Sequence, residues 1–183
     1  MLKGEKVSLH AVEKEDLEQL RIWRNNPDFR KFFKEYRELN MSQQKIWFQE
    51  KVIRDNKTLM FAIRRNEDQN LIGCCGLVYI DWIHRHADLS LYIGYDGLYI
   101  DKLGFSEESC KILLSYGFEE LGLNKVWTEI YEFDKKKDEL FRKIGFKQDG
   151  VLRQNYFFTN RWWDSKILSI LQNEFQKEAR EKF

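Results

Sequence analysis

Apolar residues recur along this chain at two spacings, and each spacing predicts one type of element. Val7 and Leu9 alternate with polar neighbours, as in a short strand. From residue 15 to residue 26 the apolar positions follow a helical period, and Pro27 ends the run because proline cannot continue a helix. A second helix is expected to begin at Ser42, which can cap it, and to end near residue 54.

Three strand-like runs come next, over residues 59–65, 71–82 and 87–95. A polar, turn-rich segment separates the first two runs, so we expect an antiparallel meander. The clearest helix of the chain follows at 106–121. Its apolar residues are spaced at three and four, two acids lie in its first turn, and Gly122 can close it.

The last third of the chain alternates between strands and helices. A strand is expected over 125–133, a helix over 137–144, and strands over 151–158 and 163–171. A strand, a helix and a strand in succession require a parallel pair, whereas the earlier meander is antiparallel. We therefore expect a single α/β (α+β) domain over residues 1–183, with a mixed, mostly antiparallel sheet of about six to seven strands flanked by about four helices.

Composition limits the kinds of partner. The 31 basic and 30 acidic side chains leave a net charge of +1, which gives no electrostatic footprint for nucleic acid or for an anionic membrane. The N-terminus lacks the apolar run of a signal peptide, and no stretch of about 18 uncharged apolar residues follows it. We expect a cytoplasmic protein that binds a small molecule or a protein.

The spacing of cysteine and histidine favours neither a metal site nor a disulfide framework. Cys74 and Cys75 are adjacent in an apolar run, and Cys110 lies in a helical pattern, so all three are expected to be small buried hydrophobes. His84 and His86 lie together, but a polar turn between strands explains them and no third ligand is apparent. We therefore expect no metal.

Residues 101–108 form the first candidate site. A strand ends there, the chain turns at Gly104, and a helix begins, so the first four N–H groups of that helix have no partner within it. Together with the helix dipole they can receive a phosphate, and Lys102 can add a cationic contact. Glu107 and Glu108 oppose an anion, so a plain capped helix without a ligand explains these residues equally well.

Several parts of the chain resemble one family in their order and spacing. These parts are residues 87–94, 104–109, 116–126 and 142–150, Arg153 and the early triplet 23–25. They resemble GNAT acetyltransferases of the branch that includes ribosomal-protein N-terminal, polyamine and nucleotide-amino-sugar acetyltransferases. The resemblance spans nearly the whole chain and implies a GNAT-like fold with acetyl-CoA as cosubstrate. It also implies direct acetyl transfer to a primary amine, such as a peptide N-terminus, an amino sugar, a polyamine or an antibiotic.

The resemblance implies which residues bind the cosubstrate. The sheet is expected to open beside one strand, whose backbone groups bond the pantetheine arm, while amides of the glycine turn hold the pyrophosphate. A strand amide near Ile93 is expected to stabilise the oxyanion. The cofactor-binding residues implied in this way are Leu91, Tyr92, Ile93, Leu103, Gly104, Phe105, Ser106 and Asp134.

The chain departs from the family pattern at four positions. Asp101 and Ser106 replace the first and last residues of the usual loop, which are Arg or Gln and Gly or Ala. Asp134 stands where an Asn is common, and Phe141 stands where a Tyr commonly protonates the departing thiolate. Phenylalanine cannot donate a proton, although a thiolate is a tolerable leaving group. The alternative is therefore a non-catalytic GNAT-like module that binds acyl-CoA as a sensor or only makes protein contacts.

Candidate catalytic and acceptor-binding residues flank the expected cleft. Asp88 and Glu129 are the candidate bases because each lies on a strand beside it, although a strand carboxylate is often only solvated. In the family the two early helices form one wall of the acceptor site; Trp23 can instead belong to the core and Arg37 to the surface. The substrate residues implied are Trp23, Arg24, Asn25, Tyr36 and Arg37. Aromatic pairs on the last two strands are expected in the core, in the acceptor wall or at a homodimer contact.

Overall fold

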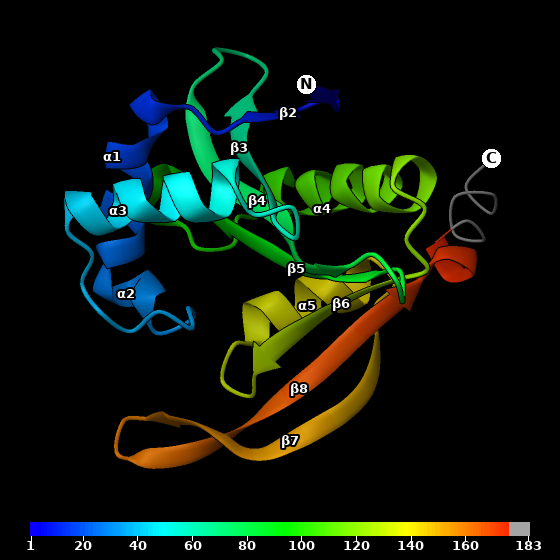
Figure 1. The fold of residues 1–183 in the computed structure, drawn as a ribbon. Coiled ribbons are helices and arrows are strands. Elements are labelled where there is room, and N and C mark those ends of the chain that lie inside the picture. Colours follow the sequence, from blue (N-terminus) through cyan, green and yellow to red (C-terminus); the bar gives the residue numbers. More distant parts are fainter. Residues whose placement is uncertain (176–183) are drawn as a thin grey trace.

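An eight-stranded mixed sheet forms the centre of the computed structural model, which describes residues 1–175 (Figure 1). Its strands lie in the order β1-β2-β3-β4-β5-β6-β8-β7, and every neighbouring pair is antiparallel except β5 and β6. The strands are β1 (Leu2–Lys3), β2 (Val7–Ala11), β3 (Leu59–Arg65), β4 (Leu71–Asp81), β5 (His86–Ile93), β6 (Lys125–Tyr131), β7 (Lys147–Phe158) and β8 (Arg161–Leu171).

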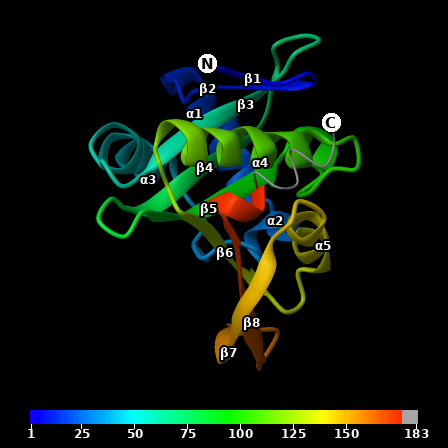
Figure 2. The same ribbon diagram turned by 90° about the vertical axis from the view of Figure 1, so that its right-hand side faces the viewer.

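Helices cover the sheet in two groups. The α-helices are α1 (Leu17–Asn25), α2 (Pro27–Arg30), α3 (Met41–Trp47), α4 (Phe105–Ser115) and α5 (Lys135–Lys143). Residues Phe48–Ile53 and Tyr116–Glu120 continue α3 and α4 as π-helical turns. The first three helices gather beside the sheet, α4 crosses the strands, and the β7–β8 hairpin extends away from the rest (Figure 2).

The expected mixed, mostly antiparallel sheet is confirmed, and two details of the prediction are wrong. The sheet has eight strands, because Leu2–Lys3 pairs with β2 and adds a short edge strand. The second helix is capped by Asn40 and not by Ser42. The Asn40 side chain accepts a hydrogen bond from the Gln43 amide at 2.9 Å, and the Gln43 side chain accepts one from the Asn40 amide at 2.9 Å. This reciprocal capping box starts α3 at Met41.

The parallel pairing between β5 and β6 is short and positions the site. Three residue pairs join the two strands, the last of them Asp88 with Trp127. Beyond Asp88, β5 continues beside β4 while β6 continues beside β8. The two strands therefore diverge, and their facing edges lie open between Asp88 and the ends of the strands.

The buried apolar residues of both parts of the sheet form one cluster. Cys74, Cys75 and Cys110 belong to it, and all three are buried free thiols, which confirms their expected role. Trp23 packs on the end of β5, where a Cβ added at Gly94 would lie 1.9 Å from its ring. Within residues 1–175, no helix is long and apolar enough to cross a membrane.

Candidate active site

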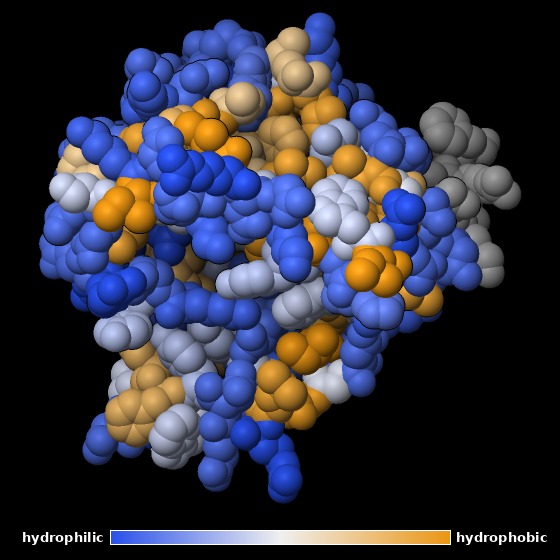
Figure 3. All heavy atoms as spheres, viewed as in Figure 1, coloured by the Kyte–Doolittle hydropathy of each residue, from blue (hydrophilic) through white to orange (hydrophobic). Residues whose placement is uncertain are grey.

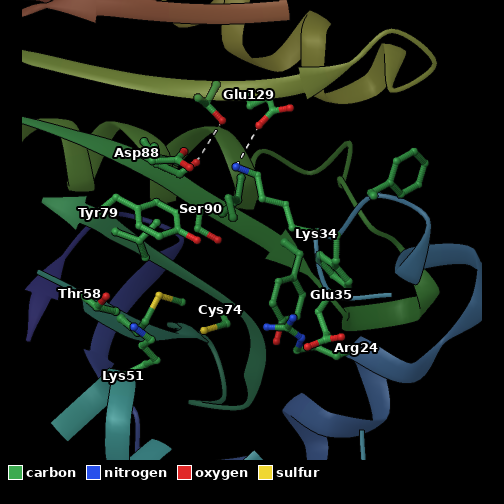
Figure 4. A pocket seen from close by; sticks show the side chains of 18 of the residues that line it. Arg24, Lys34, Glu35, Lys51, Thr58, Cys74, Tyr79, Asp88, Ser90 and Glu129 are labelled. Carbon is green, nitrogen blue, oxygen red and sulfur yellow. Dashed lines mark hydrogen bonds and ion pairs between the residues drawn. The ribbon is translucent and has the colours of Figure 1, made fainter. Parts of the chain in front are cut away.

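A cleft of about 430 Å³ opens beside the divergence of β5 and β6. Hydrophilic side chains surround this hollow on the molecular surface (Figure 3). Asp88 and Glu129 lie at one end of the cleft, Arg24 and Glu35 lie at the other, and Lys34 lies between them (Figure 4). Two of the sequence-predicted residues, Asp88 and Glu129, are thus brought together from neighbouring strands.

The open edge of β5 presents one residue whose N–H and C=O are both free. Hydrogen bonding alternates along an antiparallel strand, and the Gly94 amide donates to Ile72 of β4 at 2.8 Å, so Leu89, Leu91 and Ile93 face the other side. The Leu89 carbonyl accepts from the Thr128 hydroxyl at 3.3 Å, and the Ile93 amide donates to the Tyr99 carbonyl at 3.0 Å. The Ile93 amide is therefore already engaged, and Leu91 is the residue whose N–H and C=O point into the opening.

Asp88 is a buried carboxyl group at the point where the strands part. It is 8% exposed, and the Thr128 hydroxyl lies within hydrogen-bonding reach of it. Burial raises the pKa of Asp88 to about 6, while the charges of Lys34 and Lys137 act in the opposite direction. The pKa of Asp88 is thus much closer to 7 than that of an ordinary aspartate, which suits a general base.

Glu129 lies beside Asp88 but in a different electrostatic environment. Burial acts to raise its pKa, but the Lys34 ammonium and hydrogen bonds from Ser165 and Asn155 outweigh burial and lower it. The Lys34 Nζ lies 3.0 Å from one carboxylate oxygen, and Asn155 donates to the other at 2.7 Å. The two neighbouring carboxyl groups therefore have pKa values pushed apart, as in sites where one acts as a base and the other stays ionised.

The glycine turn before α4 is capped by its own chain. Gly104 has φ of +92°, which favours glycine, and the Asp101 carboxylate accepts hydrogen bonds from the amides of Phe105 at 2.9 Å and Ser106 at 2.7 Å. It also accepts one from the Ser106 hydroxyl. The amides of Leu103 and Gly104 donate to no residue of the described chain. Two of the four amides expected to hold a pyrophosphate are therefore already bonded to a carboxylate.

A lysine lies beside the turn before α4, and a buried aspartate caps α5. The Lys6 Nζ donates to the Leu103 carbonyl at 2.8 Å, so a lysine from the bend between β1 and β2 lies beside the turn, which the sequence spacing did not indicate. Asp134 is 3% exposed and caps α5 by accepting from the Lys137 amide at 3.1 Å. Burial raises the pKa of Asp134. Phe141 is fully buried and has an edge contact with Phe146.

Only some of the expected acceptor-binding residues line the cleft. Arg24 lines the cleft. Trp23 packs on Gly94, and Asn25 bonds both the amide and the carbonyl of Leu39 at 2.8 Å, so both hold the wall in place without lining it. Tyr36 is 78% exposed and lies outside the cleft. Arg37 lines a second hollow of about 390 Å³, which adjoins the cleft at Arg24.

Three residues that the sequence did not single out also line the cleft. Lys34 comes from the loop after α2, Gln44 comes from α3, and Thr128 precedes Glu129 on β6. Gln44 is 1% exposed, so it is a polar residue at a core-facing helix position. That position was the available signal, because a glutamine among apolar helix positions needs partners.

Residues 6–147 match the family of acetyltransferase (GNAT) domains. The chain belongs to the GNAT acetyltransferase family. It is an N-acetyltransferase that uses acetyl-CoA, in agreement with the prediction made from the resemblance. The match covers both sides of the strand divergence and the glycine turn.

Full-length relatives and solved structures give the same assignment. The chain is 28% identical over 170 residues to spermidine N(1)-acetyltransferase of Vibrio cholerae, covering 92% of this chain and 95% of the relative. It is 26% identical over 183 residues to the spermidine N(1)-acetyltransferase of Escherichia coli, with 98% and 94% covered. The fold is similar, with a TM-score of 0.85 and 26% identity, to the crystal structure of the Vibrio cholerae spermidine N-acetyltransferase in complex with CoA and spermine, with 94% and 99% covered.

The residues of this GNAT acetyltransferase fit acetyl-CoA at two places and depart from it at one. The open Leu91 carbonyl suits an N–H of a pantetheine arm, and the free amides of Leu103 and Gly104 suit a phosphate. The departure is Asp101, because its carboxylate occupies the amides of Phe105 and Ser106. A pyrophosphate can reach those two amides only after Asp101 has turned away.

Proposed function

We propose that this chain acetylates a primary amine that binds in the cleft beside Asp88 and Glu129, and that Asp88 removes the proton from that amine. The observation that carries the proposal is the buried position of the Asp88 carboxyl group, with its pKa of about 6, at the divergence of the two strands. A base is most effective when its pKa lies near the working pH. Glu129, which already bonds the Lys34 ammonium, supplies the charge that attracts a protonated amine.

The remaining steps use groups of the same cleft. Acetyl-CoA supplies a thioester carbonyl, with which the neutral amine forms the new C–N bond. The Leu91 N–H is the open backbone donor on β5 for the carbonyl oxygen, which replaces the Ile93 amide in that role. Phe141 is buried and has no proton to give. As the C–S bond breaks, solvent protonates the departing thiolate, and the second proton of the former ammonium leaves the nitrogen to solvent.

Polyamines are one candidate acceptor class, supported by the names of the relatives. Two spermidine acetyltransferases resemble this chain over nearly their whole length. In this chain, the half-exposed Lys34 side chain already brings an ammonium on a four-carbon stem to Glu129, so the cleft admits a group of that shape. An alkylammonium acceptor would replace it there.

Ligand binding and turnover test the proposal separately. At a CoA concentration of about 100 times the dissociation constant, the free energy of unfolding should rise by roughly 2.7 kcal/mol. Thiol release should then follow when acetyl-CoA is mixed with a panel of primary amines. Stabilisation by CoA without release of the CoA thiol in the presence of any amine would favour the non-catalytic sensor. Absence of stabilisation would overturn the proposal.

A further inference from the structure

The side chain of Lys34 occupies the place in the cleft that the proposed reaction assigns to an amine. Its Nζ lies 3.0 Å from a carboxylate oxygen of Glu129, and the charges of both Glu129 and Asp88 act on it. Figure 4 shows the side chain reaching from its loop toward these two acids. A primary amine of the chain itself therefore lies where an acceptor amine would lose its proton.

The two residues before Lys34 hold its backbone beside the cleft by aromatic contacts. The Phe32 ring stacks on the Tyr99 ring with centroids 4.4 Å apart. The Phe33 ring meets the Tyr92 ring of β5 edge-on, with centroids 5.2 Å apart. The Lys34 side chain itself is half-exposed. The base of this side chain is thus anchored on the sheet, while its four-carbon stem is free to move within the cleft.

The other two lysines that line the cleft, Lys51 and Lys137, are placed differently. The Lys51 Nζ pairs with Asp55 at 3.3 Å. The Lys137 Nζ lies 5.9 Å from the centre of the Phe141 ring. Within residues 1–175, Lys34 is therefore the lysine of this cleft whose ammonium pairs with an acid of the reaction site.

The protonation of Lys34 slows its reaction with a thioester but does not prevent it. Burial acts to lower the pKa of Lys34, but the hydrogen bond and charge of Glu129 and the charge of Asp88 outweigh burial and raise it. The ammonium must therefore give up a proton first, and Asp88 is the base that the site provides. In return, a tethered amine needs no binding step, because the fold already holds it at the site.

We infer that this enzyme acetylates Lys34 in its own cleft, with acetyl-CoA as the donor. Asp88 takes one proton from the Lys34 ammonium and later returns it to solvent. The neutral Nζ forms a C–N bond with the thioester carbonyl carbon as the C–S bond breaks. The nitrogen releases its second proton to solvent, and the departing CoA thiolate takes one from solvent. The inference rests on the proposed acetyl transfer and adds a substrate within the chain itself.

Acetylation removes the charge that Lys34 brings to Glu129. An acetylated lysine is neutral and forms no ion pair, so the Glu129 carboxylate becomes available to an incoming ammonium. The ion pair is partly exposed, so the gain should be modest. Self-acetylation should therefore lower KM for a cationic amine by roughly two- to fivefold.

Peptide mass spectrometry tests the inference on protein that has first been treated with a lysine deacetylase. After acetyl-CoA is added, the acetylated fraction of each lysine is followed over time. Uncatalysed transfer also modifies exposed lysines, so Lys45 of α3 and Lys51 are internal controls. Lys34 should be acetylated at least tenfold faster than either control. The rate constant should not depend on protein concentration, because the transfer occurs within one molecule.

Asp88→Asn should slow acetylation of Lys34 by about 10²-fold or more and leave acetylation of Lys45 unchanged. Asp149→Asn, at an exposed position, should leave both rates unchanged. As a second readout, prior incubation with acetyl-CoA should lower KM for the best amine of the panel in the wild type. It should leave KM unchanged in Lys34→Arg, which keeps the cation but cannot be acetylated.

The outcomes separate this inference from the proposed function. Equal rates at Lys34 and Lys45, with thiol release in the presence of an added amine, would overturn the inference and leave the proposed function intact. Equal rates without thiol release for any amine would overturn both. Fast acetylation of Lys34 that persists in Asp88→Asn, or that rises with protein concentration, would also overturn the transfer within one cleft.

Discussion

The Nζ of Lys34, in the loop after α2, lies 3.0 Å from a carboxylate oxygen of Glu129 on β6. The lysine side chain is 53% exposed, whereas the glutamate side chain is 11% exposed. The pair therefore joins the solvent-exposed ammonium of Lys34 to a largely buried carboxylate that Asn155 holds in place. It places an ammonium beside Asp88, where the proposed reaction requires an amine.

Lys34→Met should lower KM for a cationic amine, because the incoming ammonium no longer competes with the lysine for Glu129. The pair is partly exposed, so the effect should be modest, roughly two- to fivefold. Lys45→Met, at an exposed position of α3, is the matched control and should leave KM unchanged. Steady-state kinetics of thiol release measure both variants. An increase in KM on removing Lys34 would show that the lysine assists the acceptor and does not compete with it.

Asp88→Asn should abolish the base and stabilise the fold at the same time. Removing a general base should lower kcat by about 10²- to 10⁴-fold. The wild-type rate should rise with pH through about 6, because Asp88 accepts a proton only when it is ionised. Asp149→Asn, at an exposed position, should retain the wild-type rate and serves as the control. A flat pH profile between 5 and 8 would exclude Asp88 as the titrating base.

The stability of Asp88→Asn follows from the sign of the same pKa change. The folded pKa of about 6 lies above the ordinary value of 3.8, so the folded state binds the proton more tightly and wild-type stability falls as pH rises from 4 to 6. Asparagine at this position carries no charge to bury. The free energy of unfolding of the Asp88→Asn variant should exceed that of the wild type by on the order of 2–3 kcal/mol at pH 7.5, and the difference should vanish near pH 4. Urea unfolding at both pH values measures this.

Asp101→Asn should strengthen the binding of CoA, since the carboxylate now occupies two amides at the start of α4. Asparagine can still cap the helix, but it releases the amides more readily to a pyrophosphate because it has no charge. We expect roughly five- to tenfold tighter binding of CoA by isothermal titration calorimetry. Pantetheine, which has no pyrophosphate, should bind the variant and the wild type equally. If both ligands gain equally, Asp101 acts on the whole cleft and not on the phosphate site.

Gly94→Ala should strongly destabilise the fold through a single contact. The new Cβ would lie 1.9 Å from the Trp23 ring, while the backbone at φ −114° tolerates any residue, so the cost is steric. We expect a loss of about 2–3 kcal/mol on urea unfolding. In a background of Trp23→Ala, the same substitution should cost far less, because the ring is gone. Additive effects would place the strain elsewhere.

The arrangement of strands was accessible from the sequence because alternation is a local signal. Runs 59–65, 71–82 and 87–95 became β3, β4 and β5 with ends displaced by at most two residues. The cap of α3 was missed because Asn40 and Ser42 are both good capping residues. Only the reciprocal bond with Gln43 decides between them.

The candidate site was only partly accessible, because its decisive contacts join distant parts of the chain. Asp88 and Glu129 were candidates from their strands, but which face of each strand lines the cleft depends on the register of β5 with β6. The partner of Glu129 is Lys34, which comes from a loop far away in sequence. Asp101 was predicted only as a departure from the family's loop, and its role as a cap depends on how the turn at Gly104 folds back.

Three residue pairs join β5 to β6, so two antiparallel blocks, β1 to β5 and β6 with β8 and β7, share a narrow junction. Under a force that pulls the blocks apart, these few hydrogen bonds break before the longer pairings on either side. A ligand lying in the divergence touches both blocks and adds a bridge beyond the last pair. A bound ligand should therefore strengthen the junction between the two blocks. The backbone amides of the junction should then exchange with solvent more slowly when the cleft is occupied.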